Sequence, residues 1–469
     1  MTTLKQTFPF ILFFIVLTFL VRNNGFFWDS IVLGSGYANW YYTTDFKHLF
    51  VPDELAGYPP LFGMYLALGW KLFGKTLLVS HVLILPFLIG IVLQAYILVS
   101  RFVKPRYTFW VLLLVLLEPT LLAQATQVAP DVILVFLYLL CLNSILGGKR
   151  AVLALALIFI AMISPRGTIL VIALYTSDVL AGLIGKKERF TFKLLLSRIP
   201  AYIPSFIVTC IWLLLHYQHF GWIFYNKDSD WGQGSQLVSL GGFIKNLVVI
   251  GWRFADFGKA VMLILLAILL IVAYKYKKVQ RDTVLLLALI FTPLVILSGV
   301  VVFYQNPIAH RYYIVVFMLM LLLLGHLLQF ISSVKRLVAY SLTVISLLAG
   351  HYIVALYPDW LSKGWDGTLA HLPYFHLRDK MISYIKENDI AVSEVGSAYP
   401  NLRTFELTDL SNSSEKFEPK DLSTQDYIFY SNIFNDFTDE ELEELNSNWV
   451  VIKEFKDEAV FIRLYKRNK

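Results

Sequence analysis

A carboxylate set among aromatic residues is the clearest candidate for chemistry in this sequence. Asp29 lies in the stretch 25–30, which reads GFFWDS. Such a group near a membrane interface can have a raised proton affinity and act as a general base. A helix cap or a solvated loop residue would give the same pattern, and this stretch does not decide between them. Asp45, Asp53 and Glu54 follow nearby and are typical of a solvated acidic loop.

Arginines beside apolar runs are candidate partners of that carboxylate. Arg166 lies in the stretch 164–167, which reads SPRG, and Arg311 follows His310 in the stretch 310–313, which reads HRYY. A guanidinium can hold a phosphate through paired hydrogen bonds, but it can also snorkel to lipid headgroups. Both interpretations remain open for these positions. Arg253, in the stretch 251–254, is a weaker member of the set.

Two further carboxylates and one tyrosine complete the candidates. Glu118 precedes Pro119, and Asp131 follows Pro130 where an apolar run begins. Helix N-capping is the competing interpretation for Asp131. Tyr58 precedes Pro59 and Pro60, which can open a helix that Gly74 can close. That segment is short for a crossing, so we expect a helix lying in the membrane interface.

The elements that must position these residues belong to an integral membrane protein. Hydrophobic residues make up 57% of 469 positions and charged residues only 16%, whereas soluble domains carry roughly 25% charged residues. The bilayer is the natural solvent for so much apolar surface. The net charge of +7 falls in short clusters between apolar runs, which argues against nucleic-acid binding. Cys141 and Cys210 both lie in apolar runs, so we expect neither a disulfide nor a metal site.

The apolar runs predict a polytopic α-helical protein with about eleven transmembrane helices. A crossing takes about twenty residues, and the candidate spans are about 8–21, 77–100, 107–124, 129–146, 151–165, 167–184, 199–217, 259–274, 283–303, 312–330 and 337–356. No small-x-small cleavage site follows the first run, so we interpret it as an anchor helix and not as a cleaved signal.

Basic residues gather in every second connection, and this predicts the orientation. The clusters are Arg101/Lys104/Arg106, Lys149/Arg150, 186–198, 275–281 and Lys335/Arg336. Because cytoplasmic loops carry the excess of Lys and Arg, we expect a cytoplasmic N-terminus in the cell (inner) membrane. Two long connections, about 22–76 and 218–258, then face outward, as does everything after about 357.

The last part of the chain has a different composition, with shorter apolar runs and many acids. We expect residues 1–356 to form the transmembrane domain and 357–469 a small extracytoplasmic α/β domain. Helices are predicted at 381–386 and at 437–445, the second capped by Thr438. Strands are predicted at 390–392 and 427–430, with a closing pair at 449–452 and 459–462.

The order of these motifs resembles the GT-C class of membrane glycosyltransferases, in its protein O-mannosyltransferase and lipid A aminoarabinose transferase branch. An acidic residue follows the first helix, a double-proline segment ends in an aromatic-glycine pair, and a Pro-Asp pair opens the fourth span. A proline hairpin and an Arg-Tyr pair complete the pattern. The corresponding residues are Asp29, 58–61 with 70–74, Pro130-Asp131, 164–167 and Arg311-Tyr312. Where the family often has Glu beside the first Asp and Lys in the hairpin, this chain has Ser30 and Arg166.

The resemblance implies an inverting transfer of a sugar from a polyprenyl-phosphate donor to an acceptor hydroxyl at the outer membrane face. Asp29 would be the base, and Arg311, Arg166 and His310 would bind the donor phosphate. Asp131, Glu118, Tyr58 and Arg253 would line the substrate site. Arginines on a monophosphate leaving group reduce the need for a metal, so no cofactor is expected. Membrane lipids surround the chain, and the acceptor could be a lipid, a glycan or a protein.

Two other functions fit a polytopic membrane protein. A transporter or flippase of a lipid-linked saccharide would place charged or helix-breaking groups near the bilayer midplane, often in paired repeats. The spans here are almost free of such charge, and no internal duplication is visible. A membrane scaffold would leave the Asp29 stretch and the outer arginines without a shared purpose.

Overall fold

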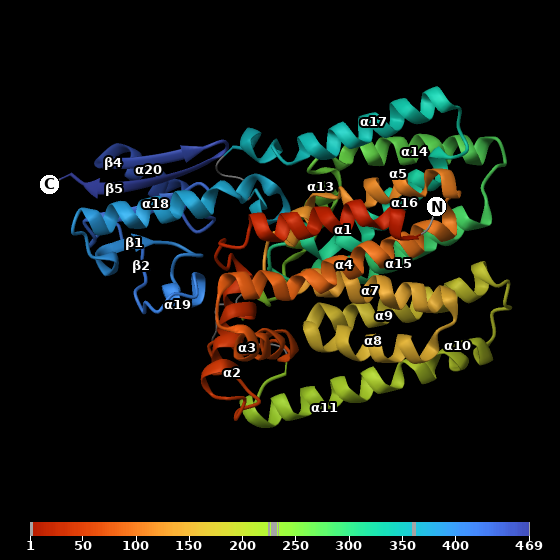
Figure 1. Cartoon of the computed structure of the whole chain (residues 1–469), viewed down its shortest axis with the longest axis horizontal. Helices are drawn as coiled ribbons and strands as arrows, with labels where there is room; N and C mark the ends of the chain where they lie inside the picture. Colours follow the sequence, from red (N-terminus) through yellow and green to blue (C-terminus); the bar gives the residue numbers. More distant parts are fainter. Residues whose placement is uncertain (1–2, 224–225, 227–231, 233, 359–362, 469) are drawn as a thin grey trace.

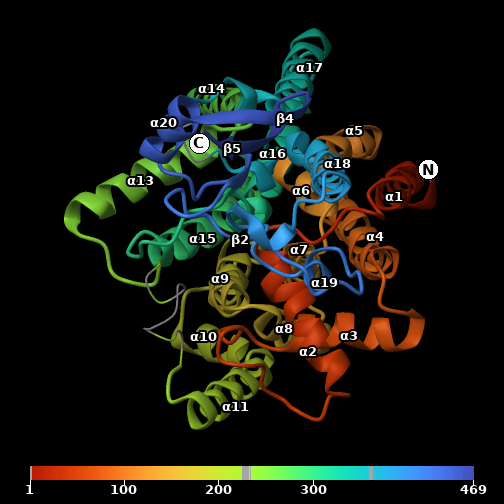
Figure 2. The same cartoon turned by 90° about the vertical axis from the view of Figure 1, so that its left-hand side faces the viewer.

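A bundle of long helices carries a small sheet-containing domain at one end in the computed structural model of the chain (Figure 1). The structure describes residues 3–223, 226, 232, 234–358 and 363–468. The C-terminus lies at the far side of the small domain, and the N-terminus lies near the opposite end of the bundle. Figure 2 looks onto the small domain from its own end of the molecule.

Eight helices of the described residues are long and apolar enough to cross a membrane. They are α1 (Thr3–Leu20), α4 (Leu77–Phe102), α7 (Pro130–Gly147), α9 (Pro165–Leu180) continued by the π-turn η2 (Ala181–Gly185), α11 (Ile203–Phe220), α15 (Arg281–Val301), α16 (Ile314–Leu328) opened by η4 (His310–Tyr313), and α17 (Ser333–Gly350). The polytopic α-helical fold with a small C-terminal sheet, expected from composition, is confirmed.

Two more candidate spans are helix pairs with a sharp bend, which brings the candidates among the described residues to ten at most, against the eleven or so predicted. The pair α5 (Pro105–Leu116) and α6 (Pro119–Ala125) bends by 67°, and the pair α13 (Leu240–Ala255) and α14 (Lys259–Lys275) bends by 88°. The shorter helix α8 (Arg150–Ile163) occupies the place of another predicted span. Each of the eleven predicted apolar runs therefore coincides with a helix.

The two long connections contain helices, of which only the one between Pro60 and Gly74 was predicted. The first contains η1 (Ile31–Gly36), α2 (Tyr37–Thr43) and α3 (Leu61–Phe73), and α3 ends at Gly74 as predicted. The second, predicted as the outer loop 218–258, contains α13. This helix was missed because its apolar residues form one stripe and not a continuous run, and it carries Lys245 and Arg253.

Helices in the bundle are buried to very different degrees. Over an 18-residue window, 83% of the α16 span and 78% of α7 is buried inside the protein, against 11% of α11 and 22% of α17. Figure 1 shows α11 and α17 along the two long edges of the bundle. Helices α16 and α7 therefore lie at the centre of the bundle. The edge helices expose apolar side chains that can contact lipid.

An ion pair inside the bundle joins the two broken spans at their bends. Glu118 precedes Pro119 at the start of α6, and its side chain accepts a 2.6 Å hydrogen bond from the Leu121 amide. Lys259 begins α14 just after Gly258, whose φ of 77° makes the turn. The Lys259 Nζ lies 3.5 Å from Glu118 Oε1, and neither side chain is exposed to solvent.

Lys259 also lies against two aromatic rings. Its Nζ is 4.4 Å from the centre of the Phe317 ring and 5.0 Å from that of Phe257. Desolvated ammonium groups are stabilised by such ring faces. Because Phe317 belongs to α16, the pair attaches both bends to the most buried span.

The C-terminal sheet has the strand order β2-β1-β3-β5-β4. The parallel strands are β1 (Val395–Ser397), β2 (Glu418–Pro419) and β3 (Tyr427–Ser431), and β4 (Trp449–Asp457) and β5 (Val460–Arg467) complete it in antiparallel fashion. The helices are α18 (Pro373–Glu387), α19 (Phe405–Thr408) and α20 (Asp439–Asn448), with short turns η5 (Ile353–Leu356), η6 (Trp365–Gly367), η7 (Leu369–His371) and η8 (Val392–Glu394).

Most of the secondary structure predicted for this part is confirmed. The strand at 427–430, the closing pair and both helices are present, and Thr438 forms a full capping box with Glu441. The strand predicted at 390–392 is wrong. The chain makes the turn η8 there, closed by a 2.9 Å hydrogen bond from the Glu394 amide to the Ala391 carbonyl, and the strand begins only at Val395.

The ion pair at the two bends gives a stability prediction. We expect Lys259→Met alone to destabilise the protein by about 3–5 kcal/mol, because it leaves the charge of the buried Glu118 carboxylate without a cation beside it. The double variant Lys259→Met/Glu118→Gln should recover to within about 1 kcal/mol, since neither charge then remains. Thermal unfolding of the purified protein in detergent measures both effects.

Lys275→Met is the matched control, since Lys275 is exposed at the other end of α14. A double variant as unstable as Lys259→Met would show that the two side chains act separately and not as a pair.

Candidate active site

Asp29 lies in a turn whose backbone conformation is strained. Trp28 has a φ of 50°, in the left-handed region that residues with a side chain rarely adopt. The Ser30 hydroxyl donates to the Phe27 carbonyl at 2.7 Å and accepts from the Phe27 amide at 2.9 Å, and Tyr399 donates to the Trp28 carbonyl. Strained turns held in this way are concentrated at functional sites. Ser30 therefore acts on the backbone of the turn.

The same turn is fixed to the C-terminal domain. Phe27 stacks on His371 with 5.3 Å between ring centres and lies among the aromatic residues of that domain. The Phe26 amide donates to the Thr408 carbonyl at 2.7 Å. Asp29 therefore lies where the first connection, the bundle and the C-terminal domain meet.

Arg311 is the partner of Asp29. It lies in η4, at the start of the central helix α16, and its Nη2 forms an ion pair with an Asp29 carboxylate oxygen. Its Nη1 lies 3.1 Å from Asp366 Oδ2. Its Nε is buried and has no hydrogen-bond partner among the described residues. One guanidinium thus holds two carboxylates and keeps one donor unused.

Asp366 was not predicted. It comes from η6, and the turn is placed by close contact, since a Cβ on Gly364 would come within 3.0 Å of His310 Nδ1. The Gln124 side chain of α6 donates to the Asp366 carbonyl at 2.9 Å. The only sequence signal is the Trp-Asp pair, which recurs at Trp365-Asp366 after Trp28-Asp29.

Arg166 and Asp131 form a second ion pair beside the first. Their atoms Nη1 and Oδ1 are 2.6 Å apart, and the pair joins the starts of α9 and α7. The Arg166 guanidinium lies 4.6 Å from the centre of the Tyr312 ring, and that of Arg311 lies 6.0 Å from it. The two arginines therefore share one aromatic neighbour, an arrangement that orients both toward the same space.

That space is a small pocket between α7, α9, α15 and η4–α16. Both arginines, Asp131 and Tyr312 form its polar end. Its walls are apolar, formed by Leu134, Val135, Leu170, Leu297, Ile314 and Val315. Its volume is only about 20 Å³, so a ligand larger than a water enters only if the surrounding helices move apart. The lining, with cations at one end and aliphatic walls, has the chemistry that suits an anionic head and a hydrocarbon chain.

The charges of this site shift the pKa of two titratable groups that lie outside the candidate spans. Burial raises the pKa of Asp366, and the neighbouring Asp29 adds to that rise while Arg311 opposes it. Burial, followed by the charge of Asp29, also raises the pKa of the Tyr58 hydroxyl. Tyr58 thus lies near the two ion pairs, as expected, and Asp366 takes up a proton more readily than an exposed aspartate.

Three other predicted residues are not brought to the pocket. His310 points away from it, with its Nε2 2.9 Å from Asp256 Oδ2 and its ring stacked on Phe257. Arg253 donates through Nε to the Ile308 carbonyl at 2.9 Å and lies 4.0 Å from Asp256. Glu118 pairs with Lys259, as described above. These residues hold the bend that supports Arg311, and Asp256 and Lys259 of this group were not predicted.

Comparison with known proteins bears on the fold of the whole chain. No protein-family model matches the sequence, and no curated protein matches it. Two solved structures of ArnT from Cupriavidus metallidurans are similar in fold. The one bound to undecaprenyl phosphate has a TM-score of 0.57 at 11% identity, covering 99% of this chain and 98% of that chain. The one in the apo state has a TM-score of 0.55 at 11% identity, covering 97% and 98%.

The similarity extends over nearly the full length of both chains, so it includes the bundle, the first connection and the C-terminal domain. The architecture expected from the order of the motifs, a helical membrane bundle with a C-terminal domain, is thereby confirmed at the level of the fold. This chain has the fold of ArnT.

Proposed function

We propose that the protein is an inverting glycosyltransferase that moves a sugar from a polyprenyl-phosphate donor to an acceptor hydroxyl. The observation that carries the proposal is the pocket in which Arg311 and Arg166 meet beside Asp29. The ArnT structure of similar fold holds undecaprenyl phosphate, which is a ligand of this kind. An anionic head and an isoprenoid chain match the polar end and the aliphatic walls of the pocket.

The arginines would bind the donor phosphate. Arg311 has an unused buried Nε donor, and a phosphate oxygen there would complete its hydrogen bonds. Arg166 would contribute a second charged donor from across Tyr312. Phosphate binding exchanges part of the Arg311 pairing with Asp29, so the carboxylate is released where the sugar arrives.

The reaction follows from these positions. Asp29 removes the proton of the acceptor hydroxyl while the oxygen attacks the anomeric carbon from the face opposite the phosphate. The bond from that carbon to the phosphate oxygen breaks, and polyprenyl phosphate leaves with the electron pair. Arg311 and Arg166 stabilise the new negative charge through charge-assisted hydrogen bonds. The product has the inverted configuration, and the proton passes from Asp29 to solvent.

The proposed location is the cell (inner) membrane, with a cytoplasmic N-terminus. Arg101, Lys186 and Arg281 gather at the bundle end away from the C-terminal domain, in agreement with the positive-inside rule. Asp29, Arg311 and residues 357–469 would then share the outer side of the membrane. The C-terminal domain would contribute Asp366 to the site and contact the acceptor.

Loss of the base gives the direct test of this proposal. Asp29→Asn should lower sugar transfer from a polyprenyl-phosphate sugar by at least about 100-fold, because the hydroxyl then lacks a proton acceptor. Transfer is measured in membranes with a radiolabelled donor. Glu54→Gln, an exposed carboxylate of the same connection, is the control and should keep full activity.

Full activity of Asp29→Asn would remove this residue from the catalytic role. Movement of the lipid-linked sugar across the membrane without transfer would instead favour a flippase.

The pKa of Asp366 gives a prediction on donor binding. Because its pKa is raised, Asp366 becomes neutral at a higher pH than an exposed aspartate does, and Arg311 then loses one competing carboxylate. We expect affinity for a polyprenyl phosphodiester, whose charge is constant in this range, to rise by about fivefold. Asp366→Asn should bind tightly at every pH and lose this dependence.

Asp379→Asn is the control for that measurement, because Asp379 also has a raised pKa but lies beside Arg378 in the C-terminal domain. Binding by fluorescence titration in detergent between mildly acidic and neutral pH separates the two. An Asp366→Asn profile identical to that of the unmodified protein would contradict the proposed competition.

A further inference from the structure

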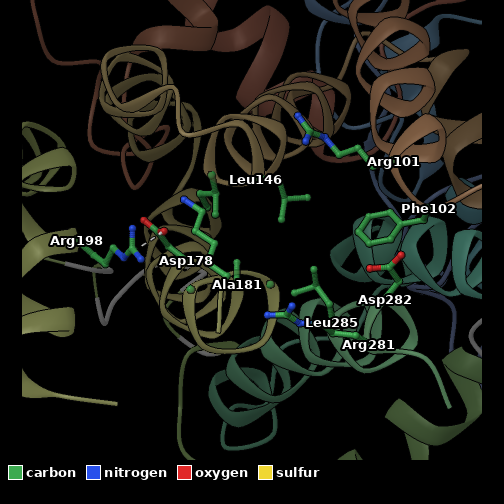
Figure 3. A pocket seen from close by; sticks show the side chains of 13 residues that line it. Arg101, Phe102, Leu146, Asp178, Ala181, Arg198, Arg281, Asp282 and Leu285 are labelled. Atoms are coloured by element: carbon green, nitrogen blue, oxygen red, sulfur yellow. Dashed lines mark ion pairs between the residues drawn. The ribbon is translucent and has the colours of Figure 1, made fainter. Parts of the chain in front are cut away.

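A second charged cavity lies at the opposite end of the bundle from Asp29. It has a volume of about 260 Å³ and is enclosed by the ends of α4 and α7, by η2, by α10 (Phe192–Arg198) and by the start of α15. Figure 3 shows Arg198 and Asp178 together on one side, with Arg101 and Arg281 entering from other directions. The cavity is open enough to be reached from outside the protein.

The charges around this cavity do not cancel. Asp178 is buried and accepts a 3.1 Å hydrogen bond from Arg150, which holds both of its oxygens. Glu188 pairs with Arg198. Five cations face three carboxylates in this group, and two positive charges therefore remain; the members are Arg101, Arg150, Lys186, Arg198, Arg281, Asp178, Glu188 and Asp282.

The cations that remain are free to bind. Among the described residues, neither the Arg101 nor the Lys186 side chain has an ion-pair or hydrogen-bond partner, although the Lys186 amide donates to the Gly182 carbonyl at 3.1 Å. Arg281 donates through Nε to the Ile184 carbonyl. Its outer nitrogen atoms stay available at the cavity wall.

Arg198 is a buried cation of this cavity and not a flexible surface side chain. Its side chain is only 10% exposed, and its Nε has no hydrogen-bond partner, being 3.8 Å from Asp178. It fits there because residue 182 is glycine, since a Cβ at Gly182 would lie 2.7 Å from both Arg198 Nη2 and a Glu188 oxygen. The π-turn η2 provides this close approach, and such turns often mark functional sites.

We propose that this cavity binds a phosphate group at the membrane surface opposite the Asp29 site. Arg101, Lys186 and Arg281 would hold the phosphate oxygens, and Arg198 would supply the field from behind. The cavity lies where the helices end, which is the depth of lipid headgroups, and basic pockets between helix ends take up anionic lipid headgroups. A bound phosphate would join α4, α9 and α15, which the unbalanced charge otherwise pushes apart.

The same chemistry could come from a lipid headgroup or from free phosphate, and the experiment separates these sources. Purified protein is titrated in detergent with phosphatidylglycerol, with phosphatidylcholine, or with inorganic phosphate, and its melting temperature is recorded. We expect phosphatidylglycerol to stabilise the protein and phosphatidylcholine to leave it unchanged. An effect of millimolar inorganic phosphate equal to that of phosphatidylglycerol would assign the site to the free anion.

The variant Arg101→Gln/Lys186→Gln should weaken binding of the stabilising phosphate compound by at least about tenfold. Each of the two lost cations contributes roughly a fivefold factor to the affinity for an anionic headgroup. Lys275→Gln/Lys278→Gln is the matched control, because both residues are exposed and lie outside the cavity. Equal melting temperatures without ligand show that both variants fold. If the control loses as much affinity as the test variant, or if no phosphate compound stabilises the protein, the proposal is wrong.

Discussion

The ion pair between Lys259 and Glu118 is the interaction on which the arrangement of the site depends. Two charges without solvent contact are costly in an apolar bundle unless they meet. They meet where two spans are broken, and the aromatic rings of Phe257 and Phe317 surround the ammonium group. Phe257 in turn stacks on His310 with 4.1 Å between ring centres. The residue after His310 is Arg311, so the bend of one span sets the position of the arginine that the pocket needs.

Arg311 then connects parts of the chain that are far apart in sequence. Asp29 comes from the first connection, where the packing of Phe27 on His371 holds the turn. Asp366 comes from the turn after the last span, where Gly364 packs closely against His310. Carboxylates on both sides keep the guanidinium in place before any ligand binds. A donor phosphate bound here, as proposed, would compete with them, and its binding would then be sensitive to the C-terminal segment. The small domain is therefore part of the site and not only an appendage to it.

Sequence patterns predicted the spans because hydropathy is local, and every apolar run became a helix. They predicted Asp29, Arg311, Arg166 and Asp131 because a charge at the edge of an apolar run is conspicuous. They could not predict Asp366, since its contact with Arg311 depends on a turn packed against His310 from 54 positions away. His310, Glu118 and Arg253 show the converse limit. The same residue types serve as supports when a buried partner such as Asp256 or Lys259 lies closer than the pocket.

The bundle has charge at both ends, but the balance differs between them. Beside Asp29, the two arginines of the pocket already face three carboxylates, so a phosphate there would bind in exchange for an existing partner. Around Arg198, cations exceed carboxylates, and a phosphate would add a partner without displacing one. Such an exchange would favour turnover, because the released carboxylate would pair with its arginine again when the phosphate leaves. A phosphate that displaces no carboxylate, as in the Arg198 cavity, would dissociate more slowly. The same chemical group would therefore be a passing reactant at one end and a lasting structural ligand at the other.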